Sequence, residues 1–224
     1  PFIICKSSGI NHIYVSRLRS RSKSNISRKL NSINKMYQVR GFKIDVLYCD
    51  NEFDNESIRN VLPHTTFEVC AAGEHVPIVE RAVRTVKDRS RCVCHSVPFK
   101  RFTKLMTIHL VVGAVKWINR FPSKGGISDS LSAAKILEGI DDPDMSIRRV
   151  PFGTYVLLYT KPINNMVPRS VTAIVLSEAN QPGGHFFMSL QTGKKLHGYK
   201  WDVLSYDDHV VYTVSTPAEL ENQP

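Results

Sequence analysis

The hydrophobic pattern of this 224-residue chain changes at about Pro151, and that change limits the folds it can adopt. Before this point, short β-rich segments alternate with longer segments whose apolar residues recur at helical spacing, which is typical of an α/β domain. After it, four short strand-like runs are separated by turn-forming residues, which indicates a small antiparallel β-barrel. The sequence therefore predicts two domains over 1–140 and 151–206, followed by a loose tail over 207–224.

The first domain is expected to contain a mixed sheet with flanking helices. Two strands, Phe2–Cys5 and His12–Leu18, are joined by a short turn and predict a hairpin. Apolar residues at helical spacing predict a helix over 24–39 that is capped by Ser24, and Lys43–Cys49 has the composition of a strand inside a sheet. The order strand, helix, strand predicts parallel pairing through a right-handed crossover.

The rest of the chain is expected to add helices and strands in separate blocks. In the first domain these are helices over 57–62, 76–94, 101–121 and 131–137 and a strand over 65–71. In the second domain they are strands over 155–159, 170–176, 185–190 and 199–204, with turns over 162–165, 180–184 and 192–195.

The charge of the chain is the first indication of its partner. The formal net charge is +10, no acidic residue precedes Asp45, and Asp88 is the one acid between Arg81 and Arg120. Excess basic charge attracts polyanions, so nucleic acid is the expected partner, with a merely solubilising basic surface as the alternative. No apolar run approaches the roughly 20 residues of a membrane-spanning helix, and no secretory signal is recognisable, so we expect an intracellular protein.

The five cysteines are odd in number and lack the spacing of a disulfide framework, so we expect reduced thiols. Cys92, Cys94 and His95 come nearest to a metal cluster. Their spacing differs from the Cys-x2-4-Cys pairing of structural zinc sites. They are therefore interpreted as residues that fill a core.

Two acidic residues occupy places typical of active groups. Asp50 follows the strand Lys43–Cys49, and the carboxyl ends of interior parallel strands are where open α/β sheets bind ligands. Glu80 lies in the first turn of the helix over 76–94 and is followed at helical spacing by Arg84, Lys87 and Arg91. Paired carboxylates can hold divalent ions. The basic side chains could bind the phosphates of a DNA backbone. The alternatives are a turn residue at Asp50 and a first-turn acid paired with Arg84 at Glu80.

At these residues the chain resembles the integrases of copia-type retrotransposons and their retroviral relatives. Asp50-Asn51-Glu52-Phe53 is similar to the family segment Asp-Asn-Gly/Glu-x-Phe, which bears the second catalytic carboxylate. Val79-Glu80-Arg81-Ala82-Val83-Arg84-Thr85-Val86 is similar to the helix Ala/Val-Glu-Arg-x-x-Arg-Thr-apolar, in which Glu is the third carboxylate. The resemblance covers the core from Pro1 to about Gly139 and then the terminal barrel.

The resemblance implies a ribonuclease-H-like core followed by an SH3-like barrel that binds DNA or chromatin. Such integrases join element DNA ends to target DNA by two-metal phosphoryl transfer with Mg2+ or Mn2+. They act in the nucleus after cytoplasmic assembly, and a homo-oligomer is possible. Asp50 and Glu80 are then the catalytic and metal-binding residues, and the expected DNA-binding residues are Arg84, Lys87, Arg91, Lys161, Lys194, Lys195 and Lys200.

The chain departs from the family in two ways. The family's first catalytic Asp lies on the opening strand of the core, and this chain is expected to begin just after that strand, as an N-terminally truncated fragment. In addition, 29 residues separate Asp50 from Glu80, fewer than is usual in the family. We therefore expect this chain alone to bind one metal ion weakly and to catalyse little.

A non-catalytic role is the competing hypothesis. The second domain carries lysines near turns and the aromatic residues Phe186, Phe187, Tyr199 and Trp201, which could bind DNA or a chromatin peptide without catalysis. Burial in a core is the alternative for those aromatics. The apolar segment Leu105–Phe121 could also form a dimer interface.

Overall fold

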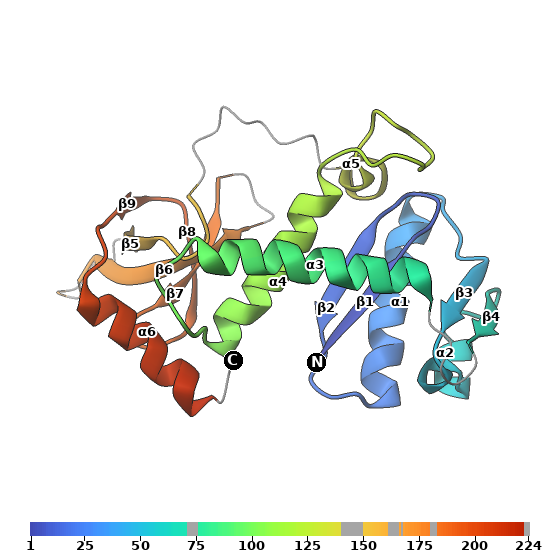
Figure 1. Ribbon diagram of the computed structural model, residues 1–224, viewed down its shortest axis with the longest axis horizontal. Coiled ribbons are helices and arrows are strands. Elements are labelled where there is room, and N and C mark those ends of the chain that lie inside the picture. Colours follow the sequence, from blue (N-terminus) through green and yellow to red (C-terminus); the bar gives the residue numbers. More distant parts are fainter. Residues whose placement is uncertain (71–75, 140–149, 161–165, 167, 180–182, 222–224) are drawn as a thin grey trace. The chain divides into compact units, whose positions relative to one another are not determined.

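A computed structural model describes most of the chain (Figure 1). The residues that it describes are 1–70, 76–139, 150–160, 166, 168–179 and 183–221. None of the described helices is both long enough and apolar enough to cross a membrane.

The chain divides into two compact units. Unit 1 comprises Pro1–Lys87 with Val115–Asp144, and unit 2 comprises Asp88–Ala114 with Met145–Pro224. The expected boundary after residue 140 assigns residues 88–114 to the first domain, whereas the structure groups them with the second. Helices α3 (Pro77–His95) and α4 (Lys104–Asn119) therefore contribute residues to both units.

Unit 1 begins with the predicted hairpin. Strand β1 (Phe2–Lys6) pairs antiparallel with β2 (Ile13–Arg17). Helix α1 (Lys23–Val39) follows and buries Ile26, Leu30, Ile33 and Tyr37, as their helical spacing predicts. Its N-cap is Ser22 rather than Ser24, because the Ser22 side chain accepts a hydrogen bond from the backbone N–H of Asn25.

A second, parallel pair of strands follows α1. Strand β3 (Val46–Cys49) pairs with β4 (Thr66–Val69), and the 3-10 turn η1 (Asn51–Phe53) and helix α2 (Glu56–Arg59) connect them. The predicted pairing of β3 with the hairpin is wrong for the described strands, which form two separate two-stranded sheets. The prediction paired β3 with the hairpin that precedes it in the chain, whereas its observed partner is β4, the strand that follows it.

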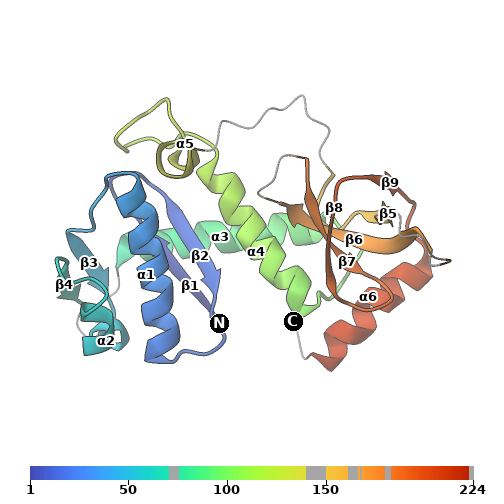
Figure 2. The ribbon, with the colours of Figure 1, turned by 180° about the vertical axis from the view of Figure 1, so that it is seen from behind.

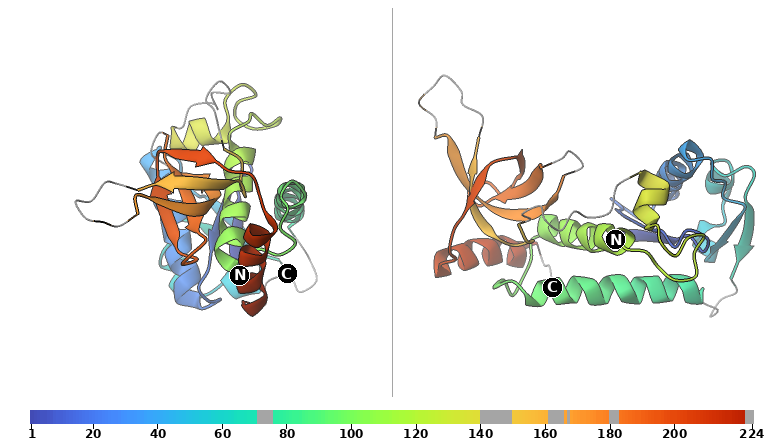
Figure 3. Two further views of the ribbon diagram at one scale, coloured as in Figure 1. Left: turned by 90° about the vertical axis from the view of Figure 1, so that its left-hand side faces the viewer. Right: turned by 90° about the horizontal axis from the view of Figure 1, so that it is seen from above.

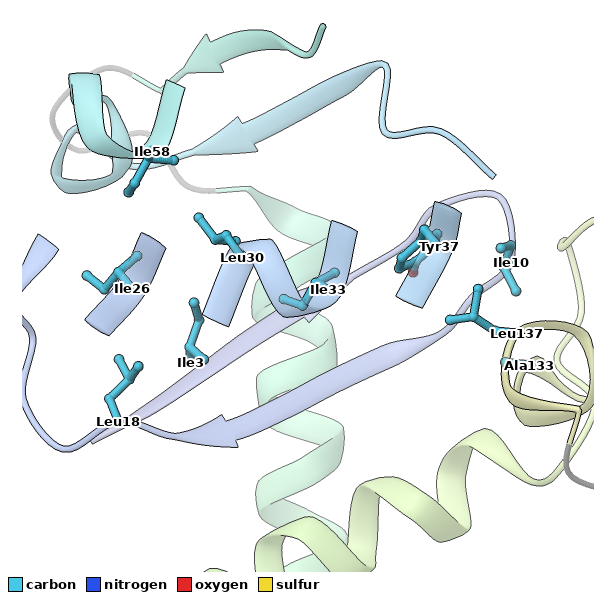
Figure 4. Close-up of a cluster of buried hydrophobic side chains, with 10 residues drawn as sticks. All are labelled: Ile3, Ile10, Leu18, Ile26, Leu30, Ile33, Tyr37, Ile58, Ala133 and Leu137. Carbon is cyan, nitrogen blue, oxygen red and sulfur yellow. The ribbon is translucent and has the colours of Figure 1, made fainter. Parts of the chain in front are cut away.

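One hydrophobic core joins the two small sheets across α1. In Figures 1 and 2 the strands follow the order β2, β1, β3, β4 across the view, and α1 covers the space between β1 and β3 from one side (Figure 3). Figure 4 shows the buried side chains that connect them: Ile3 from β1, Leu30 and Ile33 from α1, and Ile58 from α2. Among the described strands, β1 pairs only with β2, and β3 pairs only with β4. Strands β1 and β3 therefore each have one edge without a hydrogen-bonded neighbour among these strands.

The hairpin is also anchored to two later segments of unit 1. The Asn119 amide accepts a hydrogen bond from the Ile13 N–H and donates one to the Ile13 carbonyl, at 2.9 and 2.7 Å. His12 is almost completely buried, and its Nε2 lies 3.2 Å from Oε1 of Glu138 at the end of α5 (Ala133–Glu138). These contacts tie the hairpin to residues more than 100 positions away.

Stability should fall when Glu138 becomes protonated. The His12 hydrogen bond, together with neighbouring positive charges, holds the pKa of Glu138 below its usual value of 4.5, although burial opposes this. A carboxyl whose pKa is lower in the folded state stabilises the fold at neutral pH, and this contribution is lost as the pH falls through and below 4.5. We expect less than about 1 kcal/mol, because a third-exposed carboxylate is screened by water.

Urea unfolding of the wild type and of Glu138→Gln between pH 7 and pH 3 measures this contribution. The variant should be less stable at pH 7, and the difference should vanish toward pH 3. A constant difference across this range would contradict the role of the pair.

Unit 2 is built on a five-stranded antiparallel sheet in the order β8-β7-β6-β5-β9. The strands are β5 (Tyr155–Tyr159), β6 (Ser170–Glu178), β7 (His185–Ser189), β8 (Lys195–Gly198) and β9 (Trp201–Val203). The four predicted strands are present, although the last is shorter than predicted. Strand β8 was missed, because Gly193, Lys194 and Lys195 at its start indicated a turn.

The sheet of unit 2 curls but is open in its hydrogen bonding. Strands β8 and β9 lie at opposite edges, yet only Tyr199 and Lys200 separate them in the chain. The ring of Trp201 on β9 accordingly lies 5.5 Å from that of Phe187 on β7 and 4.7 Å from that of His185. Among the described strands the structure therefore shows a curled, open sheet of five strands, and the predicted small barrel is not confirmed.

A helix replaces most of the predicted loose tail. Helix α6 (Asp208–Leu220) is capped by the side chain of Asp207 and buries Val210, Val214 and Ala218. It lies along one face of the sheet (Figure 3), where Val210 and Val214 pack in a core with Ile174 and Met188. The expectation of a loose tail is wrong here because apolar residues at four-residue spacing follow a good capping residue.

Candidate functional site

Asp50 lies at the end of β3, where the sequence placed it. It is exposed and directly follows Cys49, the last residue of the strand, and it occupies the N-cap position of η1. Its side chain makes no capping hydrogen bond to that turn. The turn-residue alternative therefore lacks the contact that would explain an Asp at this position.

Asp50 belongs to a small polar group that sequence reasoning did not identify. The Arg59 Nε donates a hydrogen bond of 2.6 Å to the Asp54 carboxylate, and this bond lowers the pKa of Asp54. Burial raises the pKa of Cys49 to about 11, and the negative charges of Asp54 and Asp50 add to this effect. The five-residue separation of Asp54 and Arg59 was the available signal, but such a spacing is not a recognised helical pair.

Glu80 lies in the first turn of α3, as predicted, and is exposed. It lines a shallow hollow of about 410 Å3 together with Pro77, Arg81 and Arg84. One carboxylate and two guanidinium groups thus share this surface. Arg81, which follows Glu80 directly in the sequence, was missed as a candidate phosphate-binding residue.

The topology limits the separation of the two acids. Parallel strands β3 and β4 end at the same edge, where Cys49 pairs with Val69 and the Cys70 N–H donates to the Cys49 carbonyl at 3.0 Å. Helix α3 begins seven residues after Cys70, so its first residue lies within roughly 25 Å of that edge even if the connection is fully extended. Asp50 and Glu80 both belong to unit 1.

A complete metal site is not assembled by the residues that the structure describes. Among them, no three His, Cys, Asp or Glu side chains are grouped so that they could hold a metal ion. Two carboxylates have the oxygen donors that Mg2+ prefers, and further ligands would be needed to complete its coordination. Metal binding by Asp50 and Glu80 thus stays a prediction.

The basic residues of α3 lie on its exposed side. Arg84, Lys87 and Arg91 are exposed, and Arg91 also pairs with Asp88 at 2.9 Å. The buried line of the helix consists of Ala82, Val86 and Ser90. Val86 lies on this buried line, whereas Val76, Val79 and Val83 are half-buried.

The lysines predicted in the second domain are exposed on unit 2. Lys194, Lys195 and Lys200 lie around β8 and its connection to β9, whereas Lys161 is outside the described residues. Of the four aromatics considered there, Phe187 is fully buried and belongs to the core. Phe186 and Trp201 are half-buried and Tyr199 is exposed, so burial accounts for only part of the set.

Comparisons with known proteins find solved structures that the chain resembles. No family model matches the chain, and no curated protein matches it. The chain is similar to a solved structure, the catalytic core domain of BIV integrase, with a TM-score of 0.44 and 14% sequence identity over 62% of this chain and 85% of that one. An identity and a TM-score at this level do not define a family for this chain.

Proposed function

We propose that unit 1 is part of an integrase-like polynucleotidyl transferase core, in which Asp50 and Glu80 are two of the metal-binding carboxylates. The observation that carries the proposal is the position of Asp50 at the end of β3, beside a sheet edge that is unpaired among the described strands. The motif residues around both acids support the same assignment.

The unpaired edges of β1 and β3 could each form hydrogen bonds to one additional strand. Isolated two-stranded sheets are marginally stable, yet here two of them share one core over α1. Strands β1 and β3 run in opposite directions (Figure 4), so one strand between them would be antiparallel to β1 and parallel to β3. Its carboxyl end would then lie beside Asp50. We assign this place to a strand that precedes Pro1 and carries the third carboxylate.

Each part of the candidate site has a chemical role in this proposal. Bound Mg2+ or Mn2+ would activate an attacking oxygen and stabilise the leaving oxygen of a phosphodiester. Asp50 and Glu80 would hold the ions by their carboxylate oxygens. Arg81, Arg84 and Lys87 would bind backbone phosphates of the DNA ends and target beside them. This chain without the added strand is expected to be inactive, and an integrase role places it in the nucleus.

An assay of the extended chain tests the proposal. With the preceding strand and its Asp supplied, we expect Mg2+-dependent nicking or strand transfer on labelled oligonucleotides. Asp50→Asn and Glu80→Gln should each reduce the rate by at least about 100-fold, because the lost oxygen ligand holds the reacting ion. Glu52→Gln, at an exposed acid two residues from Asp50, is the matched control and should be active. Full activity of the doubly substituted Asp50 and Glu80 variant would eliminate their roles.

A second candidate is a DNA- or chromatin-binding module without catalysis. The exposed lysines of unit 2 favour it, as does the lack of a complete metal cluster among the described residues. In that case DNA binding should weaken steeply with salt, and neither Asp50→Asn nor divalent ions should change it.

A further inference from the structure

One face of the unit 2 sheet carries a row of rings that continues onto α4. The rings of His109 and Phe186 lie 5.6 Å apart, those of Phe186 and His197 5.4 Å, and those of His197 and Tyr199 4.9 Å. Phe186 on β7 pairs in register with His197 on β8, which places both side chains on one face. We call His109, Phe186, His197 and Tyr199 the ring row.

The ring row is held from within and exposed at its outer end. His109 Nδ1 lies 2.8 Å from the Ser177 hydroxyl, and Phe186 is half-buried against the core beneath. His197 and Tyr199 are exposed, and the exposed fraction of Tyr199 reaches 54%. The inner rings therefore support outer rings that are exposed to solvent.

A glycine makes room for the outer rings. A Cβ atom added to Gly184 would lie 2.7 Å from the Nε2 of His197 and 3.2 Å from a ring carbon of Tyr199. Both rings thus lie against the backbone at this position, where a larger residue would displace them.

The segment of the chain that carries Phe186, His197 and Tyr199 is rich in lysine, and the next acid along the chain, Asp202 on β9, accepts a hydrogen bond from the Tyr159 hydroxyl. Residues 185–201 contain three lysines, Lys194, Lys195 and Lys200, and no acid. The Lys195 ammonium lies 4.5 Å from the centre of the Phe186 ring, so a cation is fixed beside the row. Glu178 is in register with His185, one residue from Phe186 along the strand, and so projects from the opposite face. A cationic chromatin peptide would be repelled here, whereas a polyanion would be attracted.

We infer that the ring row binds single-stranded nucleic acid by stacking unpaired bases on His197 and Tyr199, with the neighbouring lysines binding phosphates. Exposed aromatic rings beside basic side chains form a surface on which single-stranded nucleic acids bind with little sequence preference. A duplex hides the faces of its bases and would engage only the lysines. This binding does not depend on Asp50, Glu80 or a metal ion, so it is independent of the function proposed for unit 1.

The test compares a dT12 strand with a 12-residue abasic strand of the same charge by fluorescence anisotropy, using the full chain. The wild type should bind dT12 at least about tenfold more tightly, since stacking of a base on one ring is worth a factor of roughly 5 to 150. The His197→Ala, Tyr199→Ala double variant should bind both strands with the same weak affinity. The matched control is Tyr212→Ala, which removes an exposed tyrosine on α6 and should leave the preference unchanged.

Further measurements separate stacking from charge. The double variant Lys194→Ala, Lys195→Ala should weaken the binding of both dT12 and the abasic strand. It should also reduce the slope of log K against log salt concentration by about 1.4, at about 0.7 per lost phosphate contact. Equal binding of dT12 and the abasic strand by the wild type would overturn the inference, and this result requires no variant to fold. Tighter binding of a lysine-rich histone-tail peptide than of dT12 would overturn it as well.

Discussion

Replacing Phe187 with alanine should lower the free energy of unfolding of unit 2 by about 3–5 kcal/mol. The Phe187 side chain is fully buried, packs with Val156, Leu158 and Ala173, and contacts the ring of Trp201. Its removal takes away apolar burial and leaves a cavity between strands that are not adjacent in the sheet. A loss of this size would unfold most of unit 2 if its stability is typical of small domains.

The two tryptophans allow this effect to be assigned to one unit. Trp117 belongs to unit 1 and Trp201 to unit 2, so in a Trp117→Phe background the fluorescence during urea unfolding reports on unit 2. Phe187→Ala should shift that transition, whereas Tyr212→Ala on the exposed side of α6 should change it by less than about 0.5 kcal/mol. A change below about 1 kcal/mol for Phe187→Ala would contradict the described core.

The strand assigned between β1 and β3 should slow amide hydrogen exchange in both strands by at least tenfold, on the order of what a few added hydrogen bonds provide. Both strands have an edge that is unpaired among the described residues, and an inserted strand would bond to each. Two edges gained at once would make this the largest local change expected in unit 1.

Mass spectrometry of exchanged peptides compares the chain with and without the preceding segment. Peptides covering β1 and β3 should both become protected, whereas peptides covering β5 and β6 provide the internal control. A matched extension with prolines at positions whose N–H groups would face β1 and at positions whose N–H groups would face β3 should protect neither strand, because proline cannot donate to a ladder. Protection of β1 without β3 would show that the segment does not lie between them.

Local sequence patterns predicted those elements whose stability is itself local. The buried residues of α1 follow from their spacing, and the hairpin follows from two β-rich runs around a turn. Strand β8 was missed because its core contact, Leu196 against the cluster around Phe187, comes from distant residues. The N-cap moved from Ser24 to Ser22 because several polar residues compete as caps there.

The sequence predicted which secondary-structure elements carry the two acids of the candidate site. The end of a strand and the first turn of a helix could be recognised for Asp50 and Glu80, because both depend on neighbouring residues. The pairing of β3 with β4 instead of the hairpin could not, since it depends on which edges remain available after folding. The Asp54–Arg59 contact and the ring row likewise depend on side chains that long-range packing brings together.

Localised cleavage by bound iron tests most directly whether Asp50 and Glu80 share an ion. Fe2+ takes oxygen ligands like those of Mg2+, and with ascorbate and peroxide it cuts the backbone near its site. We predict fragments that end near both residue 50 and residue 80, suppressed by excess Mg2+ and lost in Asp50→Asn and in Glu80→Gln but kept in Glu52→Gln. Cleavage near only one of the two positions, or cleavage unchanged by either substitution, would contradict a shared metal site.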